Sequence, residues 1–159
     1  MTRKIKFINF AYSYIKMPKE TSAGAVVFRK DKKIKYLLLY YEEGHWDFPK
    51  GNIEKGEEEK ETVKREIKEE TGISKISFIE GFKEKIQYFY KLRGETVFKQ
   101  VFFYLVEAKE SKVKLSYEHI GYKWLNYDKA LKQLTFKNAK EILKKANSFL
   151  GSGSRRFIS

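Results

Sequence analysis

Residues 51–73, GNIEKGEEEKETVKREIKEETGI, determine how the rest of the chain is interpreted. Within them Glu66, Glu69 and Glu70 stand at i, i+3 and i+4, so in a helix their carboxylates emerge within one turn. Carboxylates this close repel one another unless a cation lies among them. Ligands made of oxygen alone suit magnesium, with manganese as the alternative, better than zinc. The stretch therefore predicts a helix that holds a divalent metal.

A cluster of glutamates by itself favours a plainer interpretation, a solvent-exposed helix laced with charges. The spacing of the surrounding residues argues against it. Nine positions reproduce the Nudix box: Gly51, Glu57, Arg65, Glu66, Ile67, Glu69, Glu70, Gly72 and Ile73. The chain thus resembles the Nudix hydrolases, which cleave nucleoside diphosphates linked to another group. The resemblance implies an α/β fold, an α/β/α sandwich with a mixed β-sheet.

Other residues of the box have structural reasons of their own. Gly51 permits a tight loop whose backbone carbonyl turns toward the metal. Gly72 supplies the left-handed residue that ends the helix. Arg65 is expected on the far side of the helix from Glu66, and the resemblance implies that it ties the helix to Glu57 in the preceding loop.

Composition and charge limit the classes of protein to which this chain can belong. The chain has 159 residues, 16% of them aromatic, and no cysteine, which indicates one domain without disulfides or a thiol nucleophile. It carries no apolar run of membrane-spanning length and no signal-peptide core, so we expect a cytoplasmic protein without a membrane partner. The net charge is +13, yet residues 54–70 hold eight acids and five bases. An acidic cradle in a basic surround suits a polyphosphate with its metal, and the basic surround also suits nucleic acid.

Hydrophobic patterning divides the chain into elements. Residues 1–19 are predicted to form an N-terminal extension packed on the domain, with a nucleic-acid-binding arm as the alternative. Residues 20–150 form the Nudix domain and residues 151–159 a flexible tail. Strands are expected at 23–29, 35–41, 76–91, 95–107 and 120–125, and helices at 127–134 and 135–150, the last with Thr135 as its N-cap. Both faces of 95–107 are mostly apolar, which predicts cover on both sides.

The Nudix box specifies the chemistry but not the substrate. Outside it, IEGFKEKIQYFY (79–90), LVEAKE (105–110) and LSYEHIGYKWL (115–125) are similar to the asymmetrical diadenosine tetraphosphate (Ap4A) hydrolases of the animal and archaeal type. Those enzymes split their substrate into ATP and AMP. The form WDFPKG (46–51) departs from this likeness, because it is widespread in other branches that include RNA 5′-end pyrophosphohydrolases.

Several single residues acquire roles by that comparison. His45 corresponds to a histidine that approaches the phosphate chain, and Lys50 on the same loop suits a phosphate as well. Lys99 corresponds to a phosphate-binding lysine that would stabilise charge developing on bridging oxygens. Tyr88 and Phe136 correspond to the aromatic pair that sandwiches an adenine. Each has a plainer alternative: a structural histidine, an exposed strand lysine, or aromatic core packing.

Glu118 corresponds to the late glutamate that completes the metal site, as a ligand or as the base for the attacking water, and Glu54 is a second candidate. The resemblance then implies metal-assisted hydrolysis, in which a water attacks a phosphorus in line. Two or more magnesium ions would be held by the carbonyl of Gly51 and by Glu66, Glu69, Glu70 and Glu118. Catalytic roles fall to Glu66, Glu70, Lys99 and Glu118.

Other functions stay open beside Ap4A hydrolysis. Within the same family, the substrate could instead be an RNA 5′ end or a nucleoside triphosphate. A nucleotide- or RNA-binding module with a decayed active site is the non-enzymatic alternative. The complete set of box glutamates argues against decay. Nothing in the sequence indicates the oligomeric state.

Overall fold

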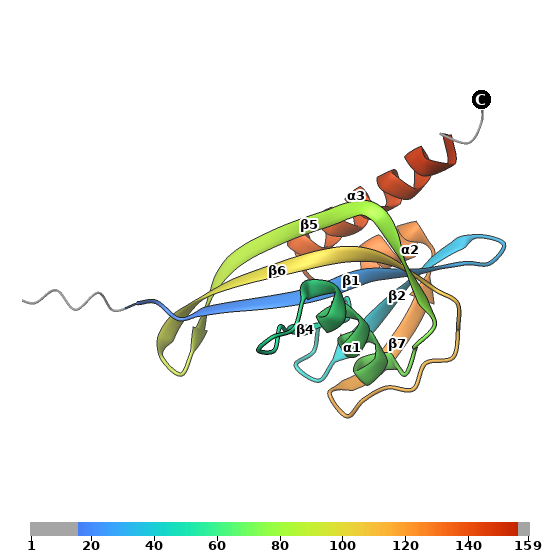
Figure 1. The fold of residues 1–159 in the computed structure, drawn as a ribbon. Coiled ribbons are helices and arrows are strands. Elements are labelled where there is room, and N and C mark those ends of the chain that lie inside the picture. Colours follow the sequence, from blue (N-terminus) through green and yellow to red (C-terminus); the bar gives the residue numbers. More distant parts are fainter. Residues whose placement is uncertain (1–15, 156–159) are drawn as a thin grey trace, which may run out of the picture.

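The computed structural model describes residues 16–155, so most of the predicted N-terminal extension lies outside the described residues (Figure 1). The elements follow the chain in the order β1 (Lys19–Lys30), β2 (Ile34–Tyr41), β3 (Trp46–Asp47), β4 (Lys50–Asn52), α1 (Glu59–Thr71), β5 (Ile76–Leu92), β6 (Glu95–Ala108), β7 (His119–Leu125), α2 (Tyr127–Gln133) and α3 (Lys137–Arg155). Within this part of the chain no helix is long and apolar enough to cross a membrane.

The strands form one mixed sheet in the order β3-β2-β1-β6-β5. Its central pair, β1 and β6, runs parallel from Lys19 opposite Phe98 to Phe28 opposite Glu107, and the other pairs are antiparallel. Along its other edge β1 changes partner, from β4 near its start to β2 near its end. β4 and β2 thus occupy successive positions along the same edge of β1.

Helices cover both faces of the sheet, α1 on one and α2 with α3 on the other (Figure 1). Alternate residues of β1 point to the two cores. Ala25 and Val27 lie in the core that α1 closes with Val63 and Ile67. On the other side the core includes Val26 and Phe28 with Leu143 and Ala146 of α3. The predicted α/β/α sandwich is confirmed.

The box helix α1 has clear signals at both ends. Glu58 and Glu61 form a capping box, in which each side chain accepts a hydrogen bond from the other residue's backbone N–H. At the end Gly72 adopts φ 73°, and its N–H donates to the carbonyl of Lys68 (2.9 Å). A residue other than glycine would be strained there, so the prediction for Gly72 is confirmed.

The end of the chain differs from the prediction. Helix α3 continues through Arg155, so residues 151–155 are helical and not a flexible tail; residues 156–159 lie outside the described part. The helix begins at Lys137, and Thr135 is therefore not its N-cap. The Thr135 hydroxyl instead accepts a hydrogen bond from the backbone N–H of Trp46 (2.8 Å), which ties the start of α3 to the loop before the Nudix box.

The prediction that β6 is covered on both faces is wrong for its first half. Val101 and Phe103 are buried on the α3 side. On the opposite side Phe98 and Phe102 are only half-buried. The reason is the position of α1, which contacts β6 at Tyr104 through a hydrogen bond from the Tyr104 hydroxyl to Glu59.

Candidate active site

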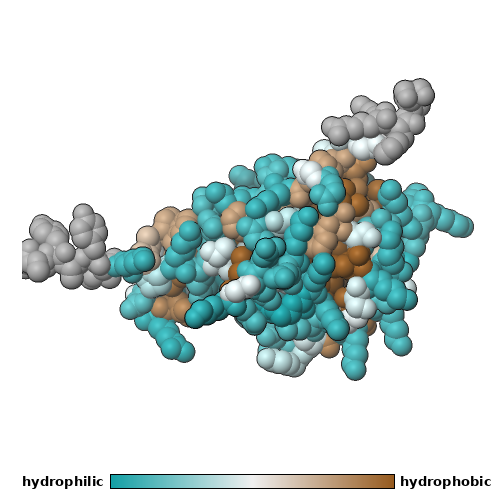
Figure 2. Space-filling view, in the orientation of Figure 1, coloured by the Kyte–Doolittle hydropathy of each residue, from teal (hydrophilic) through white to brown (hydrophobic). Residues whose placement is uncertain are grey.

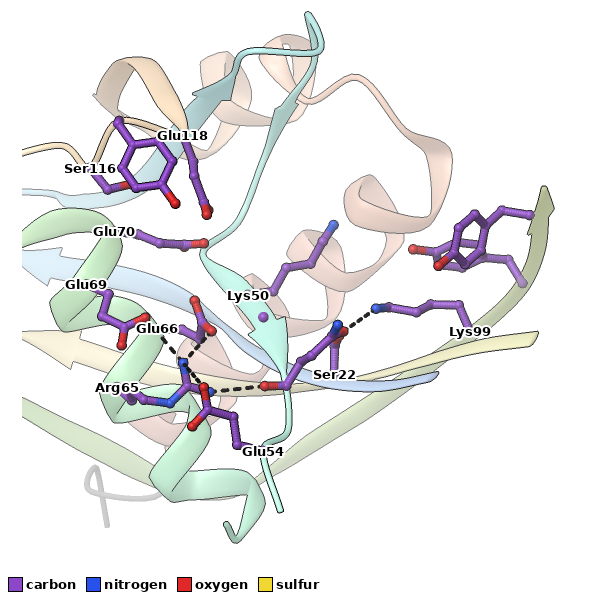
Figure 3. Close-up of a pocket in the computed structure, with 15 residues that line it drawn as sticks. Ser22, Lys50, Glu54, Arg65, Glu66, Glu69, Glu70, Lys99, Ser116 and Glu118 are labelled. Atoms are coloured by element: carbon purple, nitrogen blue, oxygen red, sulfur yellow. Dashed lines mark hydrogen bonds and ion pairs between the residues drawn. The ribbon is translucent and has the colours of Figure 1, made fainter. Parts of the chain in front are cut away.

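A cavity of about 860 Å³ lies between α1, β4, the β5–β6 hairpin and the loop before β7 (Figure 3). Most of the residues predicted from the sequence meet there, although they come from five separate segments. Those that line it are Lys50, Gly51, Glu66, Glu69, Glu70, Tyr88, Lys99 and Glu118, together with Glu54.

The three box glutamates of α1 differ in depth. Glu70 is buried, with 3% of its surface exposed, and its Oε2 has no hydrogen-bond partner among the described residues. Burial, with the nearby charges of Glu66 and Glu118, raises the pKa of Glu70 to about 9. Burial also raises the pKa of Glu66, although Arg65 acts in the opposite direction. Glu69 is the most exposed, with 58% of its side chain accessible.

Gly51 lies in β4 and not in a tight loop, because it pairs with Ala23 of β1. The need for glycine arises from Glu66. A Cβ at position 51 would lie 2.0 Å from Glu66 Oε1 and fill the space that the carboxylate occupies. The glycine therefore lets the Glu66 carboxylate of α1 approach the backbone of β4.

Arg65 ties α1 to the preceding loop, as expected. Its Nε donates to Glu57 Oε2 (2.6 Å), and this bond holds the pKa of Glu57 down at about 2. The prediction that Arg65 lies away from Glu66 is wrong. Its Nη1 donates to Glu66 Oε1 (2.7 Å) and to Glu69 Oε2 (3.2 Å), because the planar guanidinium has donors pointing in several directions.

The loop before β7 supplies the opposite wall of the acidic end. Figure 3 shows Glu118 and Glu70 pointing into the same space. Glu70, Glu118 and the buried His119 offer ligand atoms that all lie within 4.8 Å of one another. His119 Nε2 is 3.8 Å from Glu70 Oε1 and has no hydrogen-bond partner among the described residues. Two buried polar atoms without partners beside further carboxylates fit a divalent cation.

Two lysines also line this cavity. Lys50, from β4, forms an ion pair with the buried Asp47. Lys99, from β6, donates from its Nζ to Asn52 Oδ1 (2.6 Å) and to Glu20 Oε2 (3.0 Å). The alternative of an exposed strand lysine does not hold, because only 12% of the Lys99 side chain is accessible. Carboxylates and ammonium groups in one cavity suit a polyphosphate carrying divalent cations.

A second cavity of about 340 Å³ adjoins the first and shares Lys50 and Tyr88 with it. Its walls are mainly apolar and come from β5, β6 and the start of α3. Both members of the predicted aromatic pair, Tyr88 and Phe136, line it. Phe136 is 48% exposed, which excludes the core-packing alternative for this residue.

His45 lines neither cavity. Its ring stacks on Tyr41 (centroids 4.7 Å apart) and contacts Phe136 (5.1 Å). Burial lowers the pKa of His45 below its ordinary value. In this structure His45 supports the rings around the second cavity.

Sequence reasoning missed several residues of the site. Asp47 is buried and forms an ion pair with Lys50. The sequence signal that could have indicated Asp47 was the WDFPKG segment at 46–51. His119 is adjacent to Glu118 in the sequence, yet a single histidine carries no pattern of its own. Tyr41 lies against His119 (4.3 Å) and donates its hydroxyl to the Phe48 carbonyl (2.7 Å). The contact of Tyr41 with His119 joins segments that are distant in sequence, whereas Asp47 and Lys50 are three residues apart and Tyr41 and Phe48 are seven apart. Hydrophobic periodicity indicates neither kind of contact.

The fold and the acidic site together define the class of protein. The NUDIX domain matches residues 18–146, and the chain belongs to the Nudix family of hydrolases, which act on pyrophosphate bonds. The membership predicted from the box is confirmed.

Within that family the chain is similar to asymmetrical bis(5′-nucleosyl)-tetraphosphatases. It is 35% identical over 144 residues to the protein of Mus musculus, with 82% of this chain and 95% of the relative covered. A crystal structure of the Caenorhabditis elegans Ap4A hydrolase in a binary complex gives a TM-score of 0.74 at 33% identity, covering 84% of this chain and 98% of that one. An RNA pyrophosphohydrolase of Nitratiruptor is 31% identical over 138 residues, covering 74% and 87%.

Proposed function

We propose that the protein is an asymmetrical bis(5′-nucleosyl)-tetraphosphatase that hydrolyses diadenosine tetraphosphate to ATP and AMP. The observation that carries the proposal is the junction of the two cavities at Lys50 and Tyr88. One cavity offers charged walls for a phosphate chain, and the other offers aromatic walls for a base. The relatives that bear this name, similar over most of both chains, support the same substrate.

The acidic wall would hold magnesium, with manganese as the alternative, because its ligands are mainly oxygens. The ligands proposed are the Gly51 carbonyl and the carboxylates of Glu66, Glu69, Glu70 and Glu118. When bound, the cations supply Lewis acidity and lower the pKa of a coordinated water.

The protein side chains divide the remaining work. Glu118 and Glu70 face each other across the acidic end, so either can take the proton of the attacking water. Lys99 lies on β6 and Lys50 on β4 beside Gly51, and their ammonium groups would stabilise charge that develops on the phosphate oxygens. Asn52 and Glu20 hold the Lys99 ammonium in place. Tyr88 and Phe136 bind and orient an adenine.

The second candidate is RNA 5′-end pyrophosphohydrolysis. It is favoured by the similarity to the Nitratiruptor enzyme and by the net charge of +13. This reaction would use the same acidic wall. It requires the aromatic cavity to accept the 5′-terminal nucleotide of an RNA chain that continues beyond it.

A product analysis tests the proposal. The purified protein with magnesium is given diadenosine tetraphosphate, 5′-triphosphorylated RNA and ATP, separately and in competition, and the products are separated by ion-exchange chromatography. We expect ATP and AMP in equal amounts from the dinucleotide, with the highest kcat/KM of the three substrates. Two molecules of ADP would indicate symmetrical cleavage, and a higher kcat/KM on RNA would transfer the assignment to the second candidate.

A further inference from the structure

The end of the β5–β6 hairpin next to its turn, together with the start of β1, presents a regular array of side chains. The array lies on the side of the sheet that α1 covers further along. Cross-strand register places Phe89 opposite Phe98 and Gln87 opposite Gln100, with Lys19 of β1 beside Phe98. We name this surface the open face. It consists of Lys19, Thr21, Lys85, Gln87, Phe89, Lys91, Thr96, Phe98, Gln100 and Phe102.

The open face is accessible because α1 begins too far along the sheet to cover it. Helix α1 meets the hairpin at Tyr104 and Lys83, both of which contact Glu59. Beyond this row Phe89 is 62% exposed, an unusual state for a large aromatic side chain. Figure 1 shows the hairpin and β1 projecting past the helices, and Figure 2 shows hydrophobic atoms among hydrophilic ones on the projecting end.

The charged residues of the open face are all basic. The ten positions hold three lysines and no acidic residue. Glu59, at the boundary, is already paired with Lys83 (2.7 Å). A second copy of the chain seated on this face would bring lysines against lysines. The charge therefore fits a polyanion.

The aromatic rings of the open face indicate which kind of polyanion fits it. The rings of Phe89 and Phe98 lie side by side, with centroids 5.3 Å apart. Lys19 Nζ lies 6.0 Å from the centroid of the Phe98 ring, so a cation flanks the aromatic surface. Flat apolar rings with adjacent cations on a sheet surface suit unpaired bases joined by phosphates, because bases stack on the rings while the lysines neutralise the backbone. A duplex cannot use these rings, since its bases are already stacked.

We propose that the open face binds single-stranded nucleic acid, with bases stacked on Phe89 and Phe98 and phosphates held by Lys19, Lys85 and Lys91. Gln87 Nε2 donates to Gln100 Oε1 (3.2 Å), and the remaining donors and acceptors of the two amides can meet base edges between the aromatic rows. This surface does not depend on the proposed hydrolytic activity. The residues that line the catalytic cavity, Tyr88 and Lys99, alternate with those of the open face and point to the other side of the sheet.

Fluorescence anisotropy tests this proposal with 3′-labelled oligouridylate of about 12 nucleotides, a length within the range of known single-strand sites. The oligonucleotide carries a 5′ hydroxyl, and EDTA is present, so the hydrolytic site has no substrate. We expect Phe89→Ala to weaken binding about five- to a hundredfold, the range for one lost stacking contact. Phe89→Tyr should bind like the wild type, and Phe89→Leu, which keeps an apolar side chain without a ring, should bind like Phe89→Ala.

Matched charge variants separate the open face from general attraction to a basic protein. The double variant Lys19→Gln, Lys85→Gln should lower the slope of log K against log salt by about 1.4, the value for two phosphate contacts on a single strand. The control Lys32→Gln, Lys33→Gln removes the same charge from the turn between β1 and β2 and should leave the slope unchanged. Equal weakening by the two pairs, or no binding at about 50 mM salt, would overturn the proposal.

The same variants test the other occupant. Sedimentation of the wild type and of Phe89→Ala compares their oligomeric states over a range of protein concentrations. A monomer in both cases is expected. A wild-type dimer that Phe89→Ala dissociates would assign the open face to self-association and would overturn the nucleic-acid proposal. A circular dichroism spectrum and a thermal melt like those of the wild type show that Phe89→Ala is folded.

Discussion

The two adjoining cavities of the molecule are built in opposite ways. The larger one is lined by carboxylates, three from α1 and those of Glu54 and Glu118 from two loops, together with Lys50 and Lys99. The smaller one is lined mainly by rings and aliphatic groups, and contains Tyr88 and Phe136 from segments far apart in the chain. They meet at Lys50 and Tyr88. Under the proposed function, the groups for the reaction and the groups that recognise the base therefore lie in two different cavities, which share only these two residues among those described.

A change in the larger cavity should therefore affect turnover, and a change in the smaller one should affect affinity.

The largest effect is expected for Glu66→Gln. The amide keeps the size of the side chain but removes the negative charge beside Gly51, so kcat should fall by about a thousandfold or more while the fold persists. Steady-state kinetics with circular dichroism measure both. Glu54→Gln, on the exposed rim of the same cavity, is the matched control and should retain most activity. Full turnover in EDTA, or in Glu66→Gln, would contradict a metal site on this wall.

The next largest effect is expected for Lys99→Met, which should lower kcat about a hundredfold with a small change in KM. An interaction that strengthens as charge builds in the transition state appears in kcat. Because Lys99 also pairs with Glu20, the control is Glu20→Gln, which breaks the same ion pair and keeps the ammonium. A rise in KM alone would make Lys99 a binding residue, and a matching loss in Glu20→Gln would make its role structural.

Changes in the smaller cavity should act on affinity. Tyr88→Ala and Phe136→Ala should each weaken the binding of ATP and of diadenosine tetraphosphate about five- to a hundredfold, since each removes one stacking surface of roughly 1–3 kcal/mol. Inorganic tripolyphosphate, which has no ring, should bind as to the wild type. Titration calorimetry measures the affinities and thermal melts the stability. Unchanged ATP affinity in the folded double variant would remove the base-binding role from this cavity.

The smallest effect is a pH dependence of stability in the metal-free protein. The pKa of Glu70 is about 9 in the folded state against an ordinary value of 4.5, so the folded protein binds this proton more tightly than the unfolded chain does. Its contribution to stability is full below about pH 4.5 and is lost as the pH rises toward 9.

Urea unfolding in EDTA should show the effect. Glu70→Gln should gain more than about 1 kcal/mol relative to the wild type between pH 5 and pH 9, because the amide carries no charge to bury. Glu69→Gln makes the same substitution at an exposed position of the same helix, and it should not gain stability relative to the wild type over this pH range. If the free energies of unfolding of the wild type and of Glu70→Gln changed with pH in parallel, Glu70 would not carry this proton.

Local signals predicted most of the fold and the acidic wall. The helix with its glutamates, its end at Gly72 and the main strands depend on spacing and periodicity, which neighbouring residues encode. Arg65 was misplaced because helical geometry fixes the start of a long side chain and not its end. The role of Thr135 depends on its hydrogen bond with Trp46, which is 89 residues away. Helix and capping propensities depend only on neighbouring residues and cannot predict such a partner. His119 and Asp47 were missed because burial, not type, makes them important.

The parallel pairing of β1 with β6 has a consequence for the order in which the protein folds. The Nudix box is complete in the chain by residue 73, yet β1, the central strand, pairs with β6 as far as Glu107. Lys99 and Glu20 contact each other across 79 residues of sequence. Contacts between such distant residues form slowly, because a long loop must close before they stabilise anything. During synthesis, β1 therefore exposes an unpaired and strongly apolar edge until β6 has left the ribosome, and a chain truncated before β6 would contain every box glutamate without the strand that completes the site.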